Sequence, residues 1–281
     1  MTAPGITLVC GGGGAKAAAH IGALRALEEA ELVPTRFFGT SMGSVFAALF
    51  ACGVTAPQAL EKIATLGERE IVQTDPFAIF KGLWARSLLK AEPFRAALAR
   101  LVPARRFGEL AHPLTVTAVA LDTGELVLFG DGGREAPLLD ALYASCALPL
   151  FLPPAEIGGR RYADGGLRAV VPLEAAAIPP ARLVVAVDVG PGFDELAQPG
   201  PPSGLPPVVD AHNEALGILM SGQSAAQFAL WRASPNRPPL LHVRPRTRRG
   251  STFKVDQVRS YVEEGYVATR AALAGLNSGP G

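Results

Sequence analysis

A serine between two glycines, placed where an apolar run meets an apolar helix-like segment, constrains this chain most. Residues 37–44 read Phe-Phe-Gly-Thr-Ser-Met-Gly-Ser, and the uncharged segment 45–52 follows. This G-x-S-x-G pattern is typical of a tight strand-to-helix turn that exposes its central serine, Ser41. Gly39 and Gly43 lack a Cβ and let strand and helix pass closely. Unpaired N–H groups and the helix dipole at such a turn favour a developing negative charge, so Ser41 is a candidate nucleophile.

Composition excludes several classes of protein. The 281 residues are 49% hydrophobic and 18% charged, enough for a large core in one α/β domain or two smaller ones. A formal net charge of +1 provides no field that would recruit nucleic acid. Cys10, Cys52 and Cys146 are too widely spaced for a metal-ligand cluster or a disulfide framework, which indicates a reducing compartment. The first residues lack the charged region of a signal peptide, and no apolar run reaches the roughly 20 residues of a membrane span. We therefore expect a cytoplasmic protein, with peripheral contact at a membrane as an open alternative.

A second glycine-rich turn follows the first apolar strand. Ile6–Cys10 has the composition of a buried parallel strand, four glycines occupy 11–14, and helical periodicity begins at 17–30. This arrangement binds anions, because the loop N–H groups and the helix N-terminus face the same point. A P-loop is excluded, since Ala17 rather than Ser or Thr follows Lys16 and the second glycine is missing.

Two interpretations of this glycine loop remain. Gly12, Gly14 and Ala17 match the dinucleotide fingerprint G-x-G-x-x-G/A, which also needs an acidic residue about 20 positions on, at the end of the next strand. That strand is expected at 36–39, and it leads into Thr-Ser instead. The alternative is an oxyanion hole beside the serine of the next strand–helix unit. It uses both glycine motifs together and is preferred.

Alternating strand and helix patterns along the chain predict an α/β fold. Further helices are expected at 56–66, 93–101, 138–146, 209–231 and 255–276, and further strands at 114–121, 126–129, 183–189 and 240–243. Such alternation is typical of a mainly parallel sheet covered by helices on both faces.

Neither a repeat nor a domain boundary is visible, so we expect one domain over 1–281. A mobile loop is expected at 190–207, which is rich in Pro and Gly. The segment 75–90 alternates apolar and basic residues around Trp84. It is compatible with a lid, with a membrane-contacting helix or with an ordinary packed helix.

A serine hydroxyl needs a neighbour that accepts its proton. His242 follows a late strand, as the histidine of an α/β-hydrolase does, but its neighbours are apolar and the serine comes early in the chain. Two Asp-Gly-Gly triplets offer carboxylates instead. Asp131 stands among charged residues and is expected in a surface turn. Asp164 lies between apolar segments, and Gly165 and Gly166 leave room for close approach of a substrate or backbone.

Together these motifs resemble those of the patatin-like phospholipase family. The resemblance spans about 6–189, and its order and spacing fit in five stretches, 12–16, 18–22, 39–44, 144–149 and 164–166. Two departures are visible. Ala17 stands where the family's glycine motif usually ends in Gly, and Ala169 and Val170 replace an Asn that often follows the triplet.

The resemblance implies a three-layer α/β/α sandwich and a Ser41–Asp164 dyad without histidine. It also implies hydrolysis of lipid acyl esters without a metal or cofactor. N–H groups of Gly12, Gly13 and Gly14 would hold the oxyanion, with the Met42 N–H as a further donor by analogy with other serine turns. Lys16 would steer a phosphate headgroup or anchor the loop. Two alternatives stay open: an acyltransferase that uses the same serine, and a non-catalytic lipid-binding protein.

Overall fold

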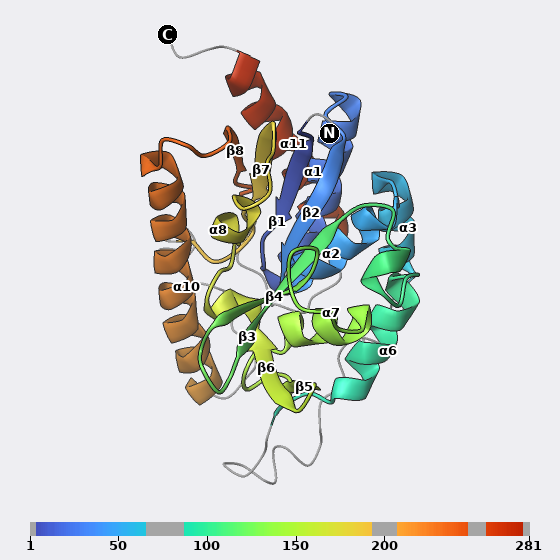
Figure 1. The fold of residues 1–281 in the computed structure, drawn as a ribbon, viewed down its shortest axis with the longest axis vertical. Helices are drawn as coiled ribbons and strands as arrows, with labels where there is room; N and C mark the ends of the chain where they lie inside the picture. The colour runs from blue at the N-terminus through green and yellow to red at the C-terminus, as the bar shows by residue number, and fades with distance from the viewer. Residues whose placement is uncertain (1–3, 66–86, 193–206, 247–256, 278–281) are drawn as a thin grey trace.

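The computed structural model describes residues 4–65, 87–192, 207–246 and 257–277 (Figure 1). Two segments with predicted roles are not fully covered by these ranges. Residues 193–206 of the expected mobile loop and 75–86 of the expected lid or membrane segment lie outside the described residues.

The described residues form one mixed sheet between two layers of helices (Figure 1). The strands are β1 Ile6–Cys10, β2 Pro34–Thr40, β3 Leu114–Ala120, β4 Leu126–Gly130, β5 Ala155–Ile157, β6 Arg160–Asp164, β7 Leu183–Val187 and β8 Leu240–Val243. Their order is β5-β6-β3-β2-β1-β7-β8, with β4 also paired to β3. The run from β3 to β8 is parallel, as the sequence predicts. β4, β5 and β6 pair antiparallel, and the β5–β6 hairpin was not expected.

Helices cover both faces of this sheet, which confirms the predicted α/β/α sandwich. They are α1 Ala19–Glu29, α2 Met42–Ala51, α3 Ala56–Ala64, α6 Ala91–Leu101, α7 Leu138–Cys146, α8 Leu173–Ala176, α10 Pro207–Ala233 and α11 Val258–Asn277. Side chains of α1, α2, α7 and α11 pack in one core, and those of α8 and the end of α10 pack in the other. The first helix begins later than predicted, because the glycine loop continues as the 3-10 turn η1, Gly14–Ala18.

The central strands have an apolar core on each side. On β1, Leu8 and Cys10 belong to one core and Val9 to the other, where Phe228 and Trp231 of α10 also pack. A strand that is buried on both faces needs apolar residues at every position rather than at alternate ones. This explains why the residues of Ile6–Cys10 are apolar apart from Thr7, which is also buried.

The last described helix packs directly on the first. A Cβ added at Gly22 of α1 would overlap the carbonyl oxygen of Val262, and one at Gly265 of α11 would overlap that of Ala19. Both positions therefore need glycine, because the two helix backbones are in contact. This contact supports α1, the helix that follows the glycine loop.

One edge of β3 brings the ends of two other strands together. β4 pairs with β3 over 115–119 and so occupies one of its edges. On the other edge, β2 ends with Thr40 opposite Thr117, and the antiparallel β6 ends with Asp164 opposite Ala118. The two strands run towards each other, so the residue after Thr40 lies beside Asp164.

Candidate active site

Ser41 lies at the turn between β2 and α2, as the sequence predicts. Its backbone has φ 53° and ψ −137°, a conformation that L-residues rarely adopt. Tight packing surrounds this turn. A Cβ at Gly39 would overlap the Cα of Ser44, and one at Gly43 would overlap the carbonyl oxygens of Cys10 and Gly11. The glycines thus allow α2 to press against β1 and β2 and leave Ser41 projecting from the turn.

The Ser41 hydroxyl donates a hydrogen bond of 2.7 Å to Oδ2 of Asp164, although the two residues are 123 positions apart. The other carboxylate oxygen, Oδ1, accepts the N–H of Gly166 at 2.7 Å. Gly165 lies against Thr117 of β3, where a Cβ would overlap the threonine backbone. The Asp-Gly-Gly triplet therefore fits a side-chain carboxylate and a tight turn into the same buried corner.

Burial controls the basicity of this carboxylate. Asp164 is only 2% exposed, and desolvation raises its pKa to about 6, against the lowering effect of the hydrogen bonds from Ser41 and Gly166. A carboxyl of this pKa is ionised at neutral pH and is a much stronger base than a solvated aspartate. The pair can therefore transfer a proton from the serine hydroxyl.

The end of α7 contacts both members of this pair through their backbones. The N–H of Ser41 donates to Oγ of Ser145 at 2.8 Å, and the N–H of Asp164 donates to the carbonyl oxygen of Ala147 at 3.0 Å. Sequence reasoning used this stretch only as part of the family resemblance and gave it no role. Its signal is the serine itself, a polar residue in an otherwise apolar helix end.

The glycine loop lies against the serine. A Cβ at Gly12 would be 3.1 Å from the Cβ of Ser41. However, the Gly12 N–H donates to the carbonyl oxygen of Val170 at 2.9 Å, so in this structure it is not available to an oxyanion. Within the described residues, the N–H groups of Gly13 and Gly14 have no acceptor. The predicted donor set is therefore revised to these two residues and Met42, whose N–H opens α2 and has no partner within the helix.

His20 holds the start of this loop. Its ring is fully buried and its Nε2 lies 2.8 Å from the carbonyl oxygen of Gly11. Because a carbonyl only accepts, Nε2 carries the proton and donates it. Burial lowers the pKa of His20 to about 4, so the ring is neutral in this position. Lys16 lies half-buried in η1, immediately before the helix.

His242 is engaged away from the serine. Its ring stacks on Phe228 with centroids 3.7 Å apart, and its Nε2 lies 3.7 Å from the carboxylate of Asp188. Asp188 in turn pairs with Arg244 at 3.0 Å. The side chain hydrogen-bonded to the Ser41 hydroxyl is the Asp164 carboxylate, so His242 does not occupy the place that a late histidine has in an α/β-hydrolase. Asp131 pairs with Arg36 at the surface, in agreement with its predicted turn.

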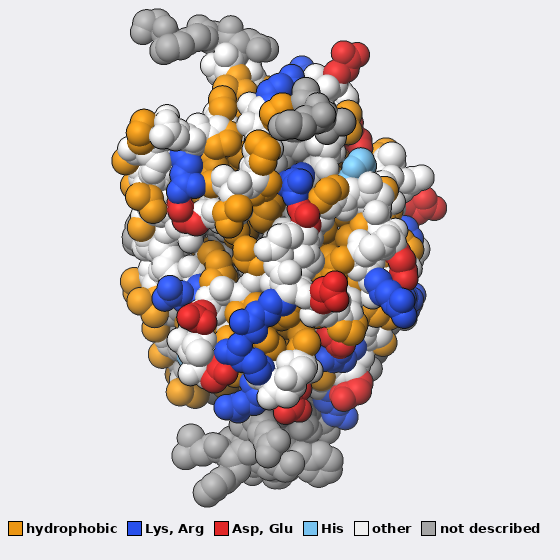
Figure 2. All heavy atoms as spheres, in the orientation of Figure 1, with side chains coloured by type: hydrophobic (Ala, Val, Ile, Leu, Met, Phe, Trp, Pro, Cys, Tyr) orange, Lys and Arg blue, Asp and Glu red, His pale blue; other side chains and the backbone are white. Residues whose placement is uncertain are grey.

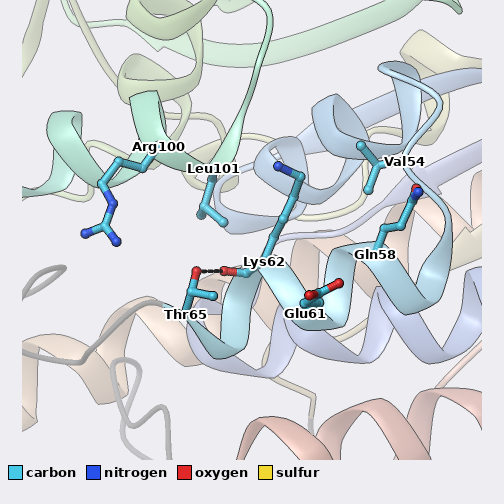
Figure 3. Close-up of a pocket in the computed structure, with 7 residues that line it drawn as sticks. All are labelled: Val54, Gln58, Glu61, Lys62, Thr65, Arg100 and Leu101. Atoms are coloured by element: carbon cyan, nitrogen blue, oxygen red, sulfur yellow. Dashed lines mark hydrogen bonds between the residues drawn. The ribbon is translucent and has the colours of Figure 1, made fainter.

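A surface pocket of about 490 Å³ lies apart from the dyad, between α3 and the end of α6 (Figure 3). Its lining residues are Val54, Gln58, Glu61, Lys62, Thr65, Arg100 and Leu101. None belongs to an element that carries Ser41 or Asp164, so this pocket is not part of the candidate site. In the part of the chain that the structure describes, no helix combines the length and the apolar character needed to cross a membrane.

Comparison with known proteins agrees with the geometry. Residues 8–177 match the model of the family described as patatin-like phospholipase. An uncharacterized NTE family protein of Mycobacterium tuberculosis is 32% identical over 193 residues, which are 67% of this chain and 50% of the relative. The human omega-hydroxyceramide transacylase is 32% identical over 139 residues, 49% of this chain and 25% of that protein. The matched part of this chain thus spans 50% of the length of the mycobacterial relative and 25% of the length of the human transacylase.

A solved structure shows the same fold. Human GIVD cytosolic phospholipase A2, in complex with methyl gamma-linolenyl fluorophosphonate, superposes with a TM-score of 0.51 at 13% sequence identity. The superposition covers 98% of this chain and 58% of that protein. The family model matches residues 8–177, more than half of the chain, and this range contains both the serine turn and the Asp164-Gly165-Gly166 triplet. The chain therefore belongs to the patatin-like phospholipase family.

Proposed function

We propose that this protein is a serine hydrolase of lipid acyl esters, of the phospholipase A, lysophospholipase or esterase type. The observation that carries the proposal is the 2.7 Å hydrogen bond from the Ser41 hydroxyl to the buried Asp164 carboxylate. Membership of the patatin-like phospholipase family supports a lipid as the substrate. No metal or cofactor takes part in the proposed reaction.

The proposed reaction has two acyl-transfer steps. Asp164 accepts the hydroxyl proton while Ser41 Oγ attacks the ester carbonyl, and N–H groups of Gly13, Gly14 and Met42 stabilise the oxyanion. The intermediate collapses to an acyl-serine, and Asp164 returns the proton to the departing alcohol. Water then attacks the acyl-serine while Asp164 accepts a proton from it. The bond between Ser41 Oγ and the acyl carbon breaks, Asp164 returns the proton to Oγ, and the fatty acid is released. A positioned base contributes roughly 10²–10⁴ in rate, and an oxyanion donor contributes on the order of 3 kcal/mol.

The dyad is tested by comparing wild type with Ser41→Ala and Asp164→Asn on a p-nitrophenyl acyl ester. We expect both variants to lose roughly 10³-fold or more in kcat, because each removes a reacting group. Asp131→Asn is the matched control, since it changes the other Asp-Gly-Gly triplet at the surface, and it should retain activity. Full activity in Ser41→Ala or Asp164→Asn would overturn the assignment. A fluorophosphonate that labels folded wild type at Ser41 separates an enzyme from a non-catalytic lipid binder.

Acyl transfer to an acceptor other than water is a second candidate function. The transacylase name of the human relative supports it, and the acyl-serine of the proposed mechanism is the intermediate that such a transfer requires. Product analysis with and without a long-chain alcohol distinguishes the two. Free fatty acid as the only product in both reactions supports hydrolysis, whereas a new ester supports transfer.

We also propose that the protein meets its substrate at a lipid surface through α10. Ile218, Leu219 and Leu230 on this helix are 57%, 63% and 52% exposed, and hydrophobic side chains line α10 at the left edge of Figure 2. The same helix contacts the turn that follows Asp164, because the Gln223 side chain donates to the carbonyl oxygen of Leu167 at 3.0 Å. An apolar helix face beside the site suits contact with lipid.

Vesicle co-sedimentation tests this contact. A variant with Ile218→Asp and Leu219→Asp should bind phosphatidylglycerol vesicles more weakly, while hydrolysis of a soluble p-nitrophenyl ester stays unchanged. Val267→Asp is the matched control, because Val267 is 56% exposed on α11, on the opposite face of the sheet. Equal vesicle binding by the double variant and the wild type would contradict the proposal.

A further inference from the structure

Ser41 and Asp164 are both hydrogen-bonded through their backbone N–H groups to one short segment, 145–147, at the end of α7. The Ser41 N–H donates to Oγ of Ser145 at 2.8 Å, and the Asp164 N–H donates to the carbonyl oxygen of Ala147 at 3.0 Å. Ser41 follows the end of β2 and Asp164 ends β6, so the two come from different strands of the sheet. The segment links them independently of their own side-chain hydrogen bond.

Ser41 needs an acceptor at this position. Ser41 lies between the end of β2 and the start of α2, with a positive φ, and its N–H is bonded to the Ser145 side chain rather than to a backbone carbonyl of either element. A buried N–H without a partner destabilises the conformation that holds it. Ser145 is fully buried, and its hydroxyl oxygen satisfies the N–H of the strained residue. Ser44 secures the other side, because its Oγ and its N–H both donate to the Ser41 carbonyl oxygen, at 2.7 and 2.8 Å.

Asp164 is held by the end of the same helix. Carbonyl groups in the last turn of a helix lack partners within the helix, and the carbonyl of Ala147, just after α7, accepts the Asp164 N–H. This bond lies beside the pairing of Asp164 with Ala118 on β3. The backbone of Asp164 is therefore held by β3 on one side and by the end of α7 on the other.

We propose that Ser145 is a positioning residue that holds Ser41 in register with Asp164 for proton transfer. This inference rests on the proposed function. Ser145 touches no reacting atom; it acts on the backbone of the nucleophile. Without its hydroxyl oxygen, the turn can relax and Oγ of Ser41 moves away from Oδ2 of Asp164. A misplacement of about 1 Å at a catalytic group costs on the order of 100-fold in rate.

The test compares Ser145→Ala, Ser145→Thr and Ser145→Val. Thr and Val have nearly the same shape and only Thr keeps the hydroxyl, so this pair separates the hydrogen bond from the added volume. On a p-nitrophenyl ester we expect Ser145→Ala and Ser145→Val to lose roughly 10- to 100-fold in kcat with KM little changed. Ser145→Thr should recover most of the loss. Ser221→Ala is the matched control, because Ser221 is a buried serine on α10 whose hydroxyl bonds within its own helix, and it should leave kcat unchanged.

Two further readouts separate positioning from a general structural role. The hydrogen bond from Ser41 lowers the pKa of Asp164, so the acid limb of the pH–rate profile should move to higher pH in Ser145→Ala. Hydrogen–deuterium exchange of the Ser41 amide should be faster in Ser145→Ala and unchanged in Ser221→Ala. This exchange measurement does not depend on activity.

Each outcome has a distinct meaning. Wild-type kcat and wild-type amide exchange in Ser145→Ala would overturn the inference, as would equal losses in the Thr and Val variants. Wild-type protein that neither hydrolyses esters nor reacts with a fluorophosphonate would overturn the proposed function instead. In that case unchanged exchange at Ser41 in Ser145→Ala still refutes the contact, and faster exchange still supports it.

Discussion

At the scale of single residues, desolvation shifts the pKa values of Asp164, which is bonded to Ser41, and of His20, which is bonded to the glycine loop, in opposite directions. Burial raises the pKa of Asp164 to about 6 and lowers that of His20 to about 4, because in both cases the neutral form is favoured. His20 therefore stays neutral above about pH 4, while Asp164 changes from neutral to charged near pH 6. Of the two groups, only the carboxylate has a pKa suited to general base catalysis.

The pH dependence of activity follows from this difference. Protonated Asp164 cannot accept the Ser41 proton, so kcat/KM on a p-nitrophenyl ester should fall about tenfold per pH unit below about pH 6. A pH–rate profile measured with a neutral substrate checks this. An acid limb near pH ~4, the value of a solvated aspartate, would contradict the role of burial.

The same carboxylate should reduce stability at neutral pH. In the unfolded chain its pKa is near ~3.9, and in the folded chain it is about 6, so the native state binds the proton more tightly. The stability that neutral Asp164 contributes is complete below about pH 4 and is lost as the pH rises through 6. This difference corresponds to about 3 kcal/mol.

Asp164→Asn cannot ionise and keeps an acceptor for the Gly166 N–H. Urea unfolding at about pH 8 should show it to be more stable than wild type, by up to about 3 kcal/mol, and the gap should close near pH 4. His20 titrates in both proteins and cancels in the comparison. A gap that does not change with pH would count against the buried charge as its cause.

At the scale of elements, the close contact of α2 with the end of β1 sets the geometry of the site. Gly43→Ala would place a methyl group against the carbonyl oxygens of Cys10 and Gly11, which are backbone atoms and cannot move aside cheaply. We expect a loss of roughly 1–3 kcal/mol in the free energy of unfolding and a large loss of kcat, because α2 carries Ser41 and β1 carries the glycine loop.

Gly222→Ala on α10 is the matched control, since a Cβ there would meet no atom within 4 Å. Alanine is the better helix former, so this variant should gain up to about 1 kcal/mol. Urea unfolding and p-nitrophenyl ester hydrolysis of both variants check the pair. Equal behaviour of the two alanine variants would show that the contact at Gly43 is not critical.

Local patterns predicted the elements better than the contacts between them. The serine turn, the glycine loop and the central strands are legible because their glycines and continuous apolar runs follow local rules. Local sequence made Asp164 a candidate base, because it lies between apolar segments beside two glycines. Its pairing with Ser41, 123 positions away, came from the family resemblance. The β5–β6 hairpin was missed because the two charged residues Arg160 and Arg161 interrupt the alternation of apolar and polar residues that predicts a strand. Its pairing with β3 is a contact between segments far apart in the sequence. Likewise, the hydrogen bond from the Gly12 N–H to the Val170 carbonyl oxygen is a tertiary contact that no local sequence pattern predicts.

At the scale of the whole molecule, the sheet extends beyond the matched family region. The family model ends at residue 177, yet β7 pairs with β1 along its whole length and β8 pairs with β7. β1 leads directly into the glycine loop, so the later strands complete the support of the site.

A fragment of residues 1–177 should therefore fail to fold cooperatively. It would leave one edge of β1 unpaired and expose apolar side chains on both faces of the strand, which favours aggregation. Circular dichroism and thermal unfolding check this against a chain that ends at Asn277 and keeps every described element. A soluble, active 1–177 fragment would contradict the expectation.

The glycine contact between α1 and α11 has a consequence for how the protein is made. Residues 258–277 leave the ribosome after every other described element, yet α1 and the loop before it depend on them. For the lipid hydrolase proposed above, a nascent chain would then contain Ser41 long before it could hydrolyse an ester, so translation itself would delay the onset of the proposed activity. Chains stalled before residue 258 should not react with a fluorophosphonate, whereas released chains should.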